Sequence, residues 1–467
     1  MSQPTDRPNQ SQQNLFYPLL KDQLNPKHPL YELANKLDWD ALEKELLPRY
    51  SHTGRPAKSI RLMAGLLLLK QLDNLGDETV IEKWLENPYY QFFCGMDVFQ
   101  WHAPVDPSDF VYFRKRLGEE GLQRIFKLSI DVHGEAVIED QVVADTTVQH
   151  KAIRFPTDSR LYMRSLEWLW RIAKQEDIKL KQSYKRVAKQ LMWDQFKGNL
   201  PNRRKKARKA QKALQVRAGR VLREVERKLS PEGLERHGVM LERITEGLAQ
   251  KRKDKNKIYS LHAPEVACIA KGKAFPQYEF GSKVSIMVGK EKGIVLAVKA
   301  FMGNPYDGDT LQPTLDVFEE LHKKKPTDAI VDRGYRKKKI GETNVHVPSP
   351  SDQDATRRQK EAKRQMFRRR TAIEPRIGHL KHHHGLNRNW LKGRVGDRAN
   401  LLLAAAAYNL RLWMIDYQRK LKQASLAPIF TWLRAFTKPL SRLSTRIHTL
   451  MPKIEYINLA CYLKMAC

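Results

Sequence analysis

Two short apolar runs, far apart in the sequence, each end at an aspartate. One covers residues 141–145 and ends at Asp145; the other covers residues 329–332 and ends at Asp332. Runs of this length and composition predict buried strands. The first and fourth strands of such a core can lie side by side, and their ends then bring the two carboxylates together. Glu374, in a basic helical stretch, can pack over the same edge. Three converging carboxylates offer the oxygen ligands that Mg²⁺ prefers.

The net charge restricts the class of partner. Lys and Arg total 85 against 52 acidic residues, which gives a formal charge of +33, while a hydrophobic fraction of 41% excludes a wholly disordered chain. A polyanionic partner explains this charge, and nucleic acid is the first candidate. A solvated basic surface and an acidic-membrane binder explain it less well, because the charge is spread along the whole chain. Carboxylates that converge in a basic protein suggest metal-assisted chemistry on a phosphodiester.

Neither the cysteines nor the apolar segments indicate export or membrane insertion. The four cysteines are scattered without a Cys-x-x-Cys pair, so we expect reduced thiols with no zinc site. The N-terminus lacks the order of a signal peptide. The most apolar run, residues 401–407, is far shorter than the ~20 residues that span a bilayer. We expect a soluble, intracellular protein with no membrane partner.

Changes in hydrophobic periodicity and in charge along the chain divide it into segments. The N-terminal part predicts helices at 29–37, around Leu42 and Leu46, at 60–75 and at 79–85, with Asp77 as an N-cap; a helix-turn-helix and a plain helical bundle both fit. The predicted boundaries are a disordered polar tail (1–27), a helical DNA-binding domain (28–136), an α/β core (137–159 and 258–415), a basic helical insert (160–257) and a basic helical C-terminal tail (416–467).

The core segments predict a mixed sheet flanked by helices. Strands are expected at 137–145, 282–288, 293–301 and 344–347 and before Asp332, with the second and third forming a hairpin. Helices are expected at 311–323, 354–381 and 399–420. Asp307-Gly308-Asp309 hints at a calcium loop, but a turn with Asp309 as the helix cap fits better. Residues 151–158 either line the mouth of the site or form a plain loop.

The insert carries a dense basic run. We define this run as Arg203, Arg204, Lys205, Lys206, Arg208 and Lys209. It is followed by a heptad-like apolar stripe, so we expect a helical hairpin whose charges contact the DNA backbone; a merely solvated face is the alternative. Trp168, Trp170 and Trp193 either stack on unpaired bases or pack the hairpin, and packing is the commoner role of apolar residues at helical spacing.

The late helix carries a spaced motif that resembles a known family. The chain has Phe367-x2-Arg370-x3-Glu374-x6-Lys381, which is similar to the Tyr-x2-Arg-x3-Glu-x6-Lys pattern of the DDE transposases of bacterial insertion sequences. It departs from that pattern only at Phe367, which lacks the tyrosine hydroxyl. The contexts Asp332-Arg333-Gly334-Tyr335 and Asp145-Thr146-Thr147 are also similar to the family's, and the order of strands resembles its ribonuclease-H-like catalytic core.

The resemblance implies a function and assigns roles. It implies that Asp145, Asp332 and Glu374 are catalytic and hold Mg²⁺, with Mn²⁺ as a substitute and two ions in the site, and that Arg370 and Lys381 bind DNA. It further implies cleavage at the ends of an insertion sequence and 3′-OH strand transfer into target DNA. The expected partners are both double-stranded DNAs and a second copy of the chain, in the bacterial cytoplasm at the nucleoid.

Two other functions stay open at the level of sequence. One is a nuclease on the same fold that cuts without strand transfer. The other is a DNA-binding protein, a repressor or architectural factor, with an inactive core. Each acid also has an ordinary structural role: Asp145 and Asp332 as strand-end caps, and Glu374 as a partner of Arg370 one helical turn away.

The basic insert predicts a steep dependence of DNA affinity on salt. If the basic run neutralises about six phosphates, affinity for duplex DNA falls by roughly a thousand-fold between about 50 and 200 mM salt. Fluorescence anisotropy over a salt series measures this slope. Replacing the six basic residues of the run with glutamine should flatten it, and a slope that the replacement leaves unchanged would contradict contact between the run and DNA.

Overall fold

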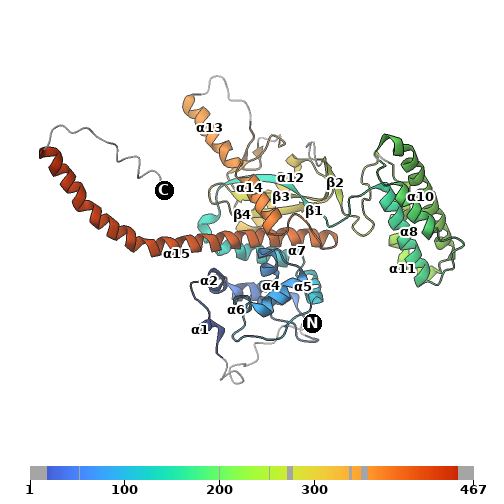
Figure 1. The fold of residues 1–467 in the computed structure, drawn as a ribbon, viewed down its shortest axis with the longest axis horizontal. Coiled ribbons are helices and arrows are strands. Elements are labelled where there is room, and N and C mark those ends of the chain that lie inside the picture. Colours follow the sequence, from blue (N-terminus) through green and yellow to red (C-terminus); the bar gives the residue numbers. More distant parts are fainter. Residues whose placement is uncertain are drawn as a thin grey trace. The chain divides into compact units, whose positions relative to one another are not determined.

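The computed structural model describes residues 18–51, 53–198, 200–251, 253–270, 277–335, 339–348 and 356–450, with side chains to residue 425. Its elements form two compact units, residues 1–412 and 413–467. The first contains the sheet, and α15 continues from the first unit into the second (Figure 1).

The strands form one mixed sheet, as predicted. They are β1 Gln141–His150, β2 Ala267–Ala270, β3 Tyr278–Gly289, β4 Val295–Phe301, β5 Asp328–Ile330, β6 Lys339–Ile340 and β7 Thr343–His346. The order is β2-β3-β1-β5-β7-β6, with β4 paired to β3. The predicted neighbourhood of the two aspartate-bearing strands is confirmed: β1 pairs in parallel with β5, with Val142 opposite Ala329 and Val143 opposite Ile330.

Both of these strands differ from their predicted bounds. We predicted that each ends at its aspartate, but β1 runs on to His150 and places Asp145 in mid-strand, opposite Ile286 of β3. Residues 135–137 form a 3₁₀ turn instead of the start of the strand. β5 ends at Ile330, two residues before Asp332. The antiparallel pairing with β3 explains the longer β1, because it supplies backbone partners as far as His150.

The helices beside the sheet also differ from prediction. They are α12 Asp307–His322, α13 Arg357–Arg370, α14 Ile373–His383 and α15 Gly393–Leu450. The single helix predicted over 354–381 is therefore two helices separated at Thr371 and Ala372; Asp354 lies outside the described residues. Asp309 does not cap α12, since Tyr306 occupies the N-cap position. In Figure 1, α12 and α14 lie beside β1, β3 and β4, in keeping with the contacts of α12 with β3 and β4 and of α14 with β1.

The N-terminal part consists of helices in the described residues from 18 to 140, apart from short turns. Their bounds are α1 Leu20–Gln23, α2 Pro29–Lys36, α3 Trp39–Leu46, α4 Ile60–Leu72, α5 Asp77–Glu86, α6 Pro88–Phe93 and α7 Pro107–Asp131. Two expectations fail here. Residues 20–23, predicted to be disordered, form α1 with Leu20 buried, and Asp77 is not an N-cap but the first residue of α5, where it accepts hydrogen bonds from Arg114.

A buried polar network joins these helices to the sheet-bearing part. The Gln71 amide of α4 donates to the His384 carbonyl at 2.5 Å and to Asn400 Oδ1 at 3.3 Å. Asn400 in turn donates to Gln149 of β1 at 3.0 Å. Burial lowers the pKa of His384 to about 4, so this side chain is neutral at physiological pH. The network satisfies polar groups that would otherwise destabilise the contact.

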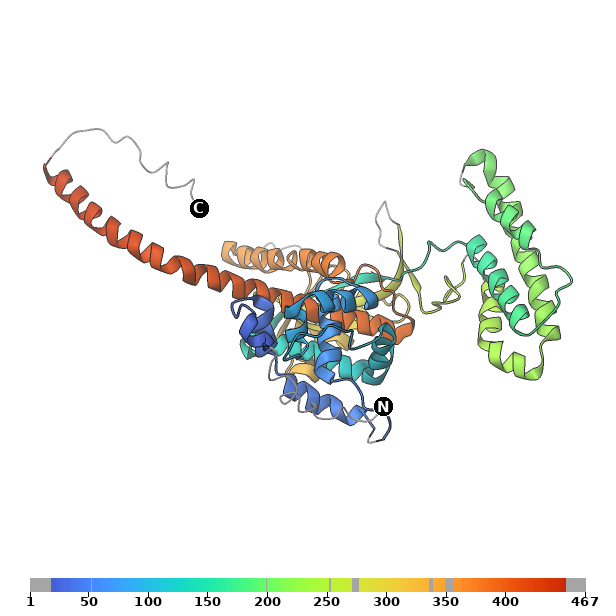
Figure 2. The same cartoon turned by 60° about the horizontal axis from the view of Figure 1, so that its bottom comes forward.

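Four helices, α8 Asp158–Gln175, α9 Lys185–Asp194, α10 Pro201–Lys228 and α11 Pro231–Ala249, lie side by side with an apolar core of their own (green in Figures 1 and 2). The heptad-like stripe of α10 is buried in it. Trp168 and Trp170 pack against this core, but Trp193 does not: 67% of its surface is exposed. Packing therefore explains two of the three tryptophans.

Three further observations concern α15, the cysteines and the apolar character of the helices. In the second unit, Trp413 and Tyr417 stack within α15 with ring centroids 5.4 Å apart, and residues 451–467 lie outside the described part of the chain. Cys94 and Cys268 are free thiols. None of the described helices combines the length and apolar character needed to cross a membrane.

Close approach of β1 and β3 generates a stability prediction. A Cβ at Gly281 would lie 1.9 Å from the Gln149 carbonyl oxygen, so Gly281→Ala forces the strands apart. We expect the free energy of unfolding to fall by about 1–3 kcal/mol, as measured by urea denaturation followed by circular dichroism. Gly238→Ala is the matched control: nothing lies within 4 Å of its Cβ position inside α11, and alanine should stabilise the helix by about 0.5–1 kcal/mol. Equal effects of the two changes would contradict the close approach.

Candidate active site

Asp145 and Asp332 face one cation. The Arg370 guanidinium Nη2 lies 3.4 Å from Asp332 Oδ1 and 4.0 Å from Asp145 Oδ2. The side chains of Arg370 and Asp145 are mostly buried, at 14% and 19% exposure, whereas that of Asp332 is half exposed. We call Asp145 and Asp332 the aspartate pair. Two carboxylates this close to a common cation would repel each other without it, so the site has a strong preference for bound positive charge.

Backbone pairing accounts for the aspartate pair. The parallel register places Val143 opposite Ile330, and Asp145 and Asp332 each follow two residues later. Local hydrogen bonds orient both carboxylates. Asp145 Oδ1 accepts from the Thr146 backbone N–H at 2.7 Å, and Asp332 Oδ1 accepts from that of Arg333 at 2.6 Å. The ordinary role of strand-end cap is thus partly present at Asp332.

Glu374 stands apart from the aspartate pair in this structure. It is exposed, as the second residue of α14, and forms no ion pair with a described residue. Its alternative role as the partner of Arg370 is not observed, because the ion pairs of Arg370 are those with the aspartate pair. Across the described ranges, no three His, Cys, Asp or Glu side chains form a group that could hold a metal ion. Two of the three predicted acids are therefore brought together and the third is not.

Sequence reasoning missed a second charged pair beside Asp145. The Lys283 ammonium of β3, only 8% exposed, lies 2.7 Å from Asp307 Oδ1, and the Thr146 hydroxyl donates to the same oxygen at 2.7 Å. Asp307 begins α12, and its Oδ2 lies 3.3 Å from the Cβ position of Gly334. Asp307 is thus wedged between the neighbours of both catalytic candidates. The sequence hinted at this acid only as part of a turn, and its partner Lys283 gave no signal within a strand.

Tyr335 is buried close to the carboxylates of the site. Its side chain is 2% exposed, and burial raises the pKa of its hydroxyl, an effect to which the charges of Asp145 and Asp307 add. The hydroxyl therefore stays protonated and polar next to two carboxylates. The glycine of the Asp-x-Gly-Tyr context also has a structural reason, because Gly334 leaves room for Asp307.

The predicted DNA-binding residues occupy three places. Arg370 contacts the aspartate pair, as described. Lys381 lines a cavity of about 1330 Å³ between α4, α5, α7 and the segment 381–400, together with Lys70, Arg388 and Lys392. The basic run lies on α10, exposed except for the half-buried Arg203, and Lys206 is paired with Asp194 at 2.9 Å. Of residues 151–158, Lys151 does not line the site: it is buried in ion pairs with Glu265 and Asp397.

Known proteins agree with the class that this geometry indicates. Residues 249–410 match the family described as a transposase DDE domain, and residues 18–116 match the one described as a transposase domain (DUF772). The chain belongs to the DDE transposases of insertion sequences and is a DNA transposase. It is also similar to an uncharacterized protein, ORF8 in the nfe locus of Rhizobium meliloti, with 45% identity over 188 residues that cover 39% of this chain and 91% of that protein. No solved structure matches the chain.

The shared cation generates a metal-linked stability prediction. Arg370→Gln removes the positive charge between the two aspartates, which should cost about 1 kcal/mol without metal. It also removes the competitor of a divalent ion, so added Mg²⁺ should raise the Tm of the variant more than that of the unaltered protein. Differential scanning fluorimetry over a Mg²⁺ series measures both effects.

The neighbouring arginine supplies the control for that experiment. Arg369 pairs with Glu291 at 2.9 Å, and both side chains are more than half exposed. Arg369→Gln should leave the Tm and its response to Mg²⁺ close to those of the unaltered protein. If Arg370→Gln responds to Mg²⁺ no more than Arg369→Gln does, the aspartate pair is not a cation site.

Proposed function

We propose that this transposase cleaves DNA at the ends of its insertion sequence and joins the freed 3′-hydroxyl to target DNA, with Asp145, Asp332 and Glu374 as the catalytic carboxylates. The observation that carries the proposal is the aspartate pair on neighbouring parallel strands, both facing the Arg370 guanidinium. The surrounding sheet and helices support a ribonuclease-H-like core.

The donor set fits divalent metal, and we propose Mg²⁺, with Mn²⁺ as a substitute and two ions in the site. Carboxylate oxygens are the ligands that hard cations prefer, and the guanidinium between Asp145 and Asp332 already stands in for positive charge. Glu374 lies four residues beyond Arg370, across the break between α13 and α14, and in this proposal it joins the aspartate pair when metal and DNA bind. When bound, the ions would supply charge stabilisation for in-line displacement at phosphorus.

The protein's own side chains have distinct tasks in this proposal. Arg370 holds the aspartate pair together before DNA arrives, and its planar guanidinium is suited to bind the phosphate next to the scissile bond. Lys283 and Asp307 fix the Thr146 hydroxyl and thereby the strand segment that carries Asp145. Tyr335, which stays protonated, fills buried space near Asp145 and Asp307 without adding negative charge.

Duplex DNA is the proposed partner of the basic surfaces. Lys381 and Lys392 line the cavity described above, and the basic run lies on α10, so both places offer positive charge to which phosphates could bind. We further propose that two copies of the chain act together on the two ends of the element, at the bacterial nucleoid. Small-angle scattering of the complex with a terminal-repeat duplex, expected to show two chains per synapsed pair of ends, addresses that arrangement.

Asp332→Asn tests the catalytic assignment. The amide keeps the size and hydrogen-bonding capacity of the side chain but loses the charge that holds a cation. We expect cleavage of a terminal-repeat duplex in Mg²⁺ to fall on the order of a thousand-fold or more, because metal-assisted charge stabilisation supplies several kcal/mol. DNA affinity, measured by anisotropy, should be retained.

An acid away from the site supplies the matched control. Asp316 is exposed on α12, where it accepts a hydrogen bond from Gln312 one turn earlier, so Asp316→Asn should cleave normally. A joining assay with a second, labelled duplex then separates transposition from simple nuclease action. Cleavage by Asp332→Asn at the normal rate would overturn the assigned site.

A further inference from the structure

We infer that a pocket at the base of the four-helix insert binds an unpaired DNA nucleotide, with the base stacked on Trp193 and the phosphate held by basic side chains of the lining, among them Arg160 of α8 and Arg208 of α10. This inference deepens the proposed function, on which it rests for the choice of DNA as the ligand. No part of it depends on the aspartate pair.

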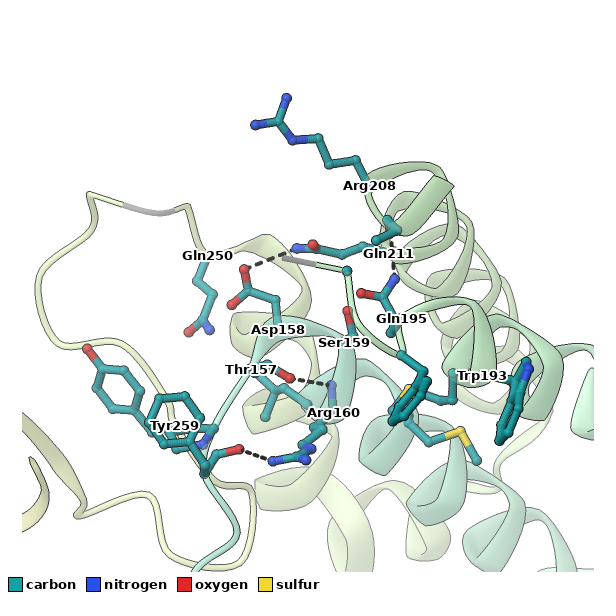
Figure 3. Close-up of a pocket in the computed structure, with 18 of the residues that line it drawn as sticks. Thr157, Asp158, Ser159, Arg160, Trp193, Gln195, Arg208, Gln211, Gln250 and Tyr259 are labelled. Carbon is teal, nitrogen blue, oxygen red and sulfur yellow. Dashed lines mark hydrogen bonds between the residues drawn. The ribbon is translucent and has the colours of Figure 1, made fainter. Parts of the chain in front are cut away.

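The pocket is large and lies where the insert joins the sheet. It has a volume of about 1500 Å³, and residues from the start of α8, the turn between α9 and α10, and the strands β2 and β3 line it. Figure 3 shows Asp158, Arg160 and Gln211 around its interior and Trp193 at one side. On the side of the pocket formed by the sheet, aromatic rings pack together. The ring centroid of Phe280 of β3 lies 5.3 Å from that of Phe155 and 5.3 Å from that of Tyr259.

The aromatic wall is exposed and preformed. Trp193 and Phe196 stack with ring centroids 5.8 Å apart and planes inclined by 17°, yet 67% and 54% of their surfaces remain exposed. Trp168 and Trp170, in contrast, pack against the insert core. Two parallel rings left open at a pocket edge form a platform on which a flat base can stack without any rearrangement of the protein.

The charge of the pocket matches a phosphodiester. Its basic lining residues are Arg160, Lys189, Lys197, Arg204, Arg208 and Lys257. None of the six forms an ion pair with a described acid, and the one carboxylate of the lining, Asp158, accepts a hydrogen bond from Gln211 at 3.2 Å. Six basic side chains around one carboxylate, which is already hydrogen-bonded, create a positive potential that attracts an anion.

The exposed rings of Trp193 and Phe196, together with the basic lining residues, favour binding of an unpaired strand over a duplex. Stacking needs a base face that is free of its neighbours, whereas a duplex offers only its backbone and groove edges at its flanks. A single-stranded segment presents base and phosphate at once, as the ring platform and the cations require. We therefore expect the pocket to add affinity for unpaired DNA and little for duplex.

The test compares two DNAs and three variants of the full-length protein. A fluorescently labelled oligo(dT) of about ten nucleotides probes the pocket, and a blunt duplex of unrelated sequence probes the remaining DNA surfaces. Trp193→Ala should weaken oligo(dT) binding about ten-fold, and Trp193→Phe, which keeps a flat ring, should restore most of it. Trp101→Ala is the control, because Trp101 is 75% exposed beside Phe99, in the segment between α6 and α7, and lies outside the pocket. Because Trp193 is exposed, the Tm of the variant should stay unchanged.

The affinities for oligo(dT) and for duplex DNA decide whether the pocket binds an unpaired nucleotide. Selective loss of oligo(dT) affinity in Trp193→Ala, with duplex affinity kept and with recovery in Trp193→Phe, supports the pocket. Unchanged oligo(dT) affinity, or an equal loss for oligo(dT) and duplex, overturns it. Failure of the proposed function looks different, since it appears as normal DNA cleavage by Asp332→Asn, whatever Trp193 does.

Discussion

The parallel pairing of β1 with β5 is the constraint on which the site depends. These strands are separated in the chain by the helical insert and by the β3–β4 hairpin, yet their register sets Val143 opposite Ile330 and so brings Asp145 level with Asp332. A shift of one residue would turn one of the two carboxylates to the other face of the sheet. Antiparallel β3 fixes β1 from its other side over nine residue pairs, so the register is held from both edges. The separation of the two acids in sequence is thus unrelated to their distance in space.

The buried and half-buried carboxylates of the site are paired with cations. Carboxylates gather around β1 and the start of α12, and each has a cation within reach: Arg370 for the aspartate pair and Lys283 for Asp307. Elsewhere the same rule holds for buried groups, as in the pairs of Lys151 with Glu265 and Asp397. The large excess of basic residues is what remains after these pairings, and it lies on exposed surfaces such as the basic run and in the insert pocket. A buried charge without its partner would destabilise the fold, and exposed basic groups attract a polyanion.

The patterns that predicted well are those in which local chemistry and tertiary context agree. The apolar runs before Asp145 and Asp332 can only be buried, so the mixed sheet and the neighbourhood of these strands followed from them. Prediction was weaker where a neighbour decides an element's end. β1 extends past Asp145 because β3 pairs with it, and the helix predicted over 354–381 breaks at Thr371 although residues on both sides favour helix. Asp307 and Lys283 left no pattern in the sequence because their meeting depends on how α12 packs against the sheet.

The sequence alone determined the chemical types: the acids, their strand and helix contexts, the spacing of Arg370, Glu374 and Lys381, and an overall charge suited to DNA. These are properties of residues and of periodicities of a few positions, which are read without knowledge of distant neighbours. Only the tertiary structure decided that Arg370 faces both aspartates, that Glu374 stands apart from them, and that Trp193 is open while Trp168 and Trp170 are packed. The physical reason is the same in each case. Orientation and exposure depend on contacts between segments far apart in the chain, and such contacts arise only when the sheet and the helices pack together.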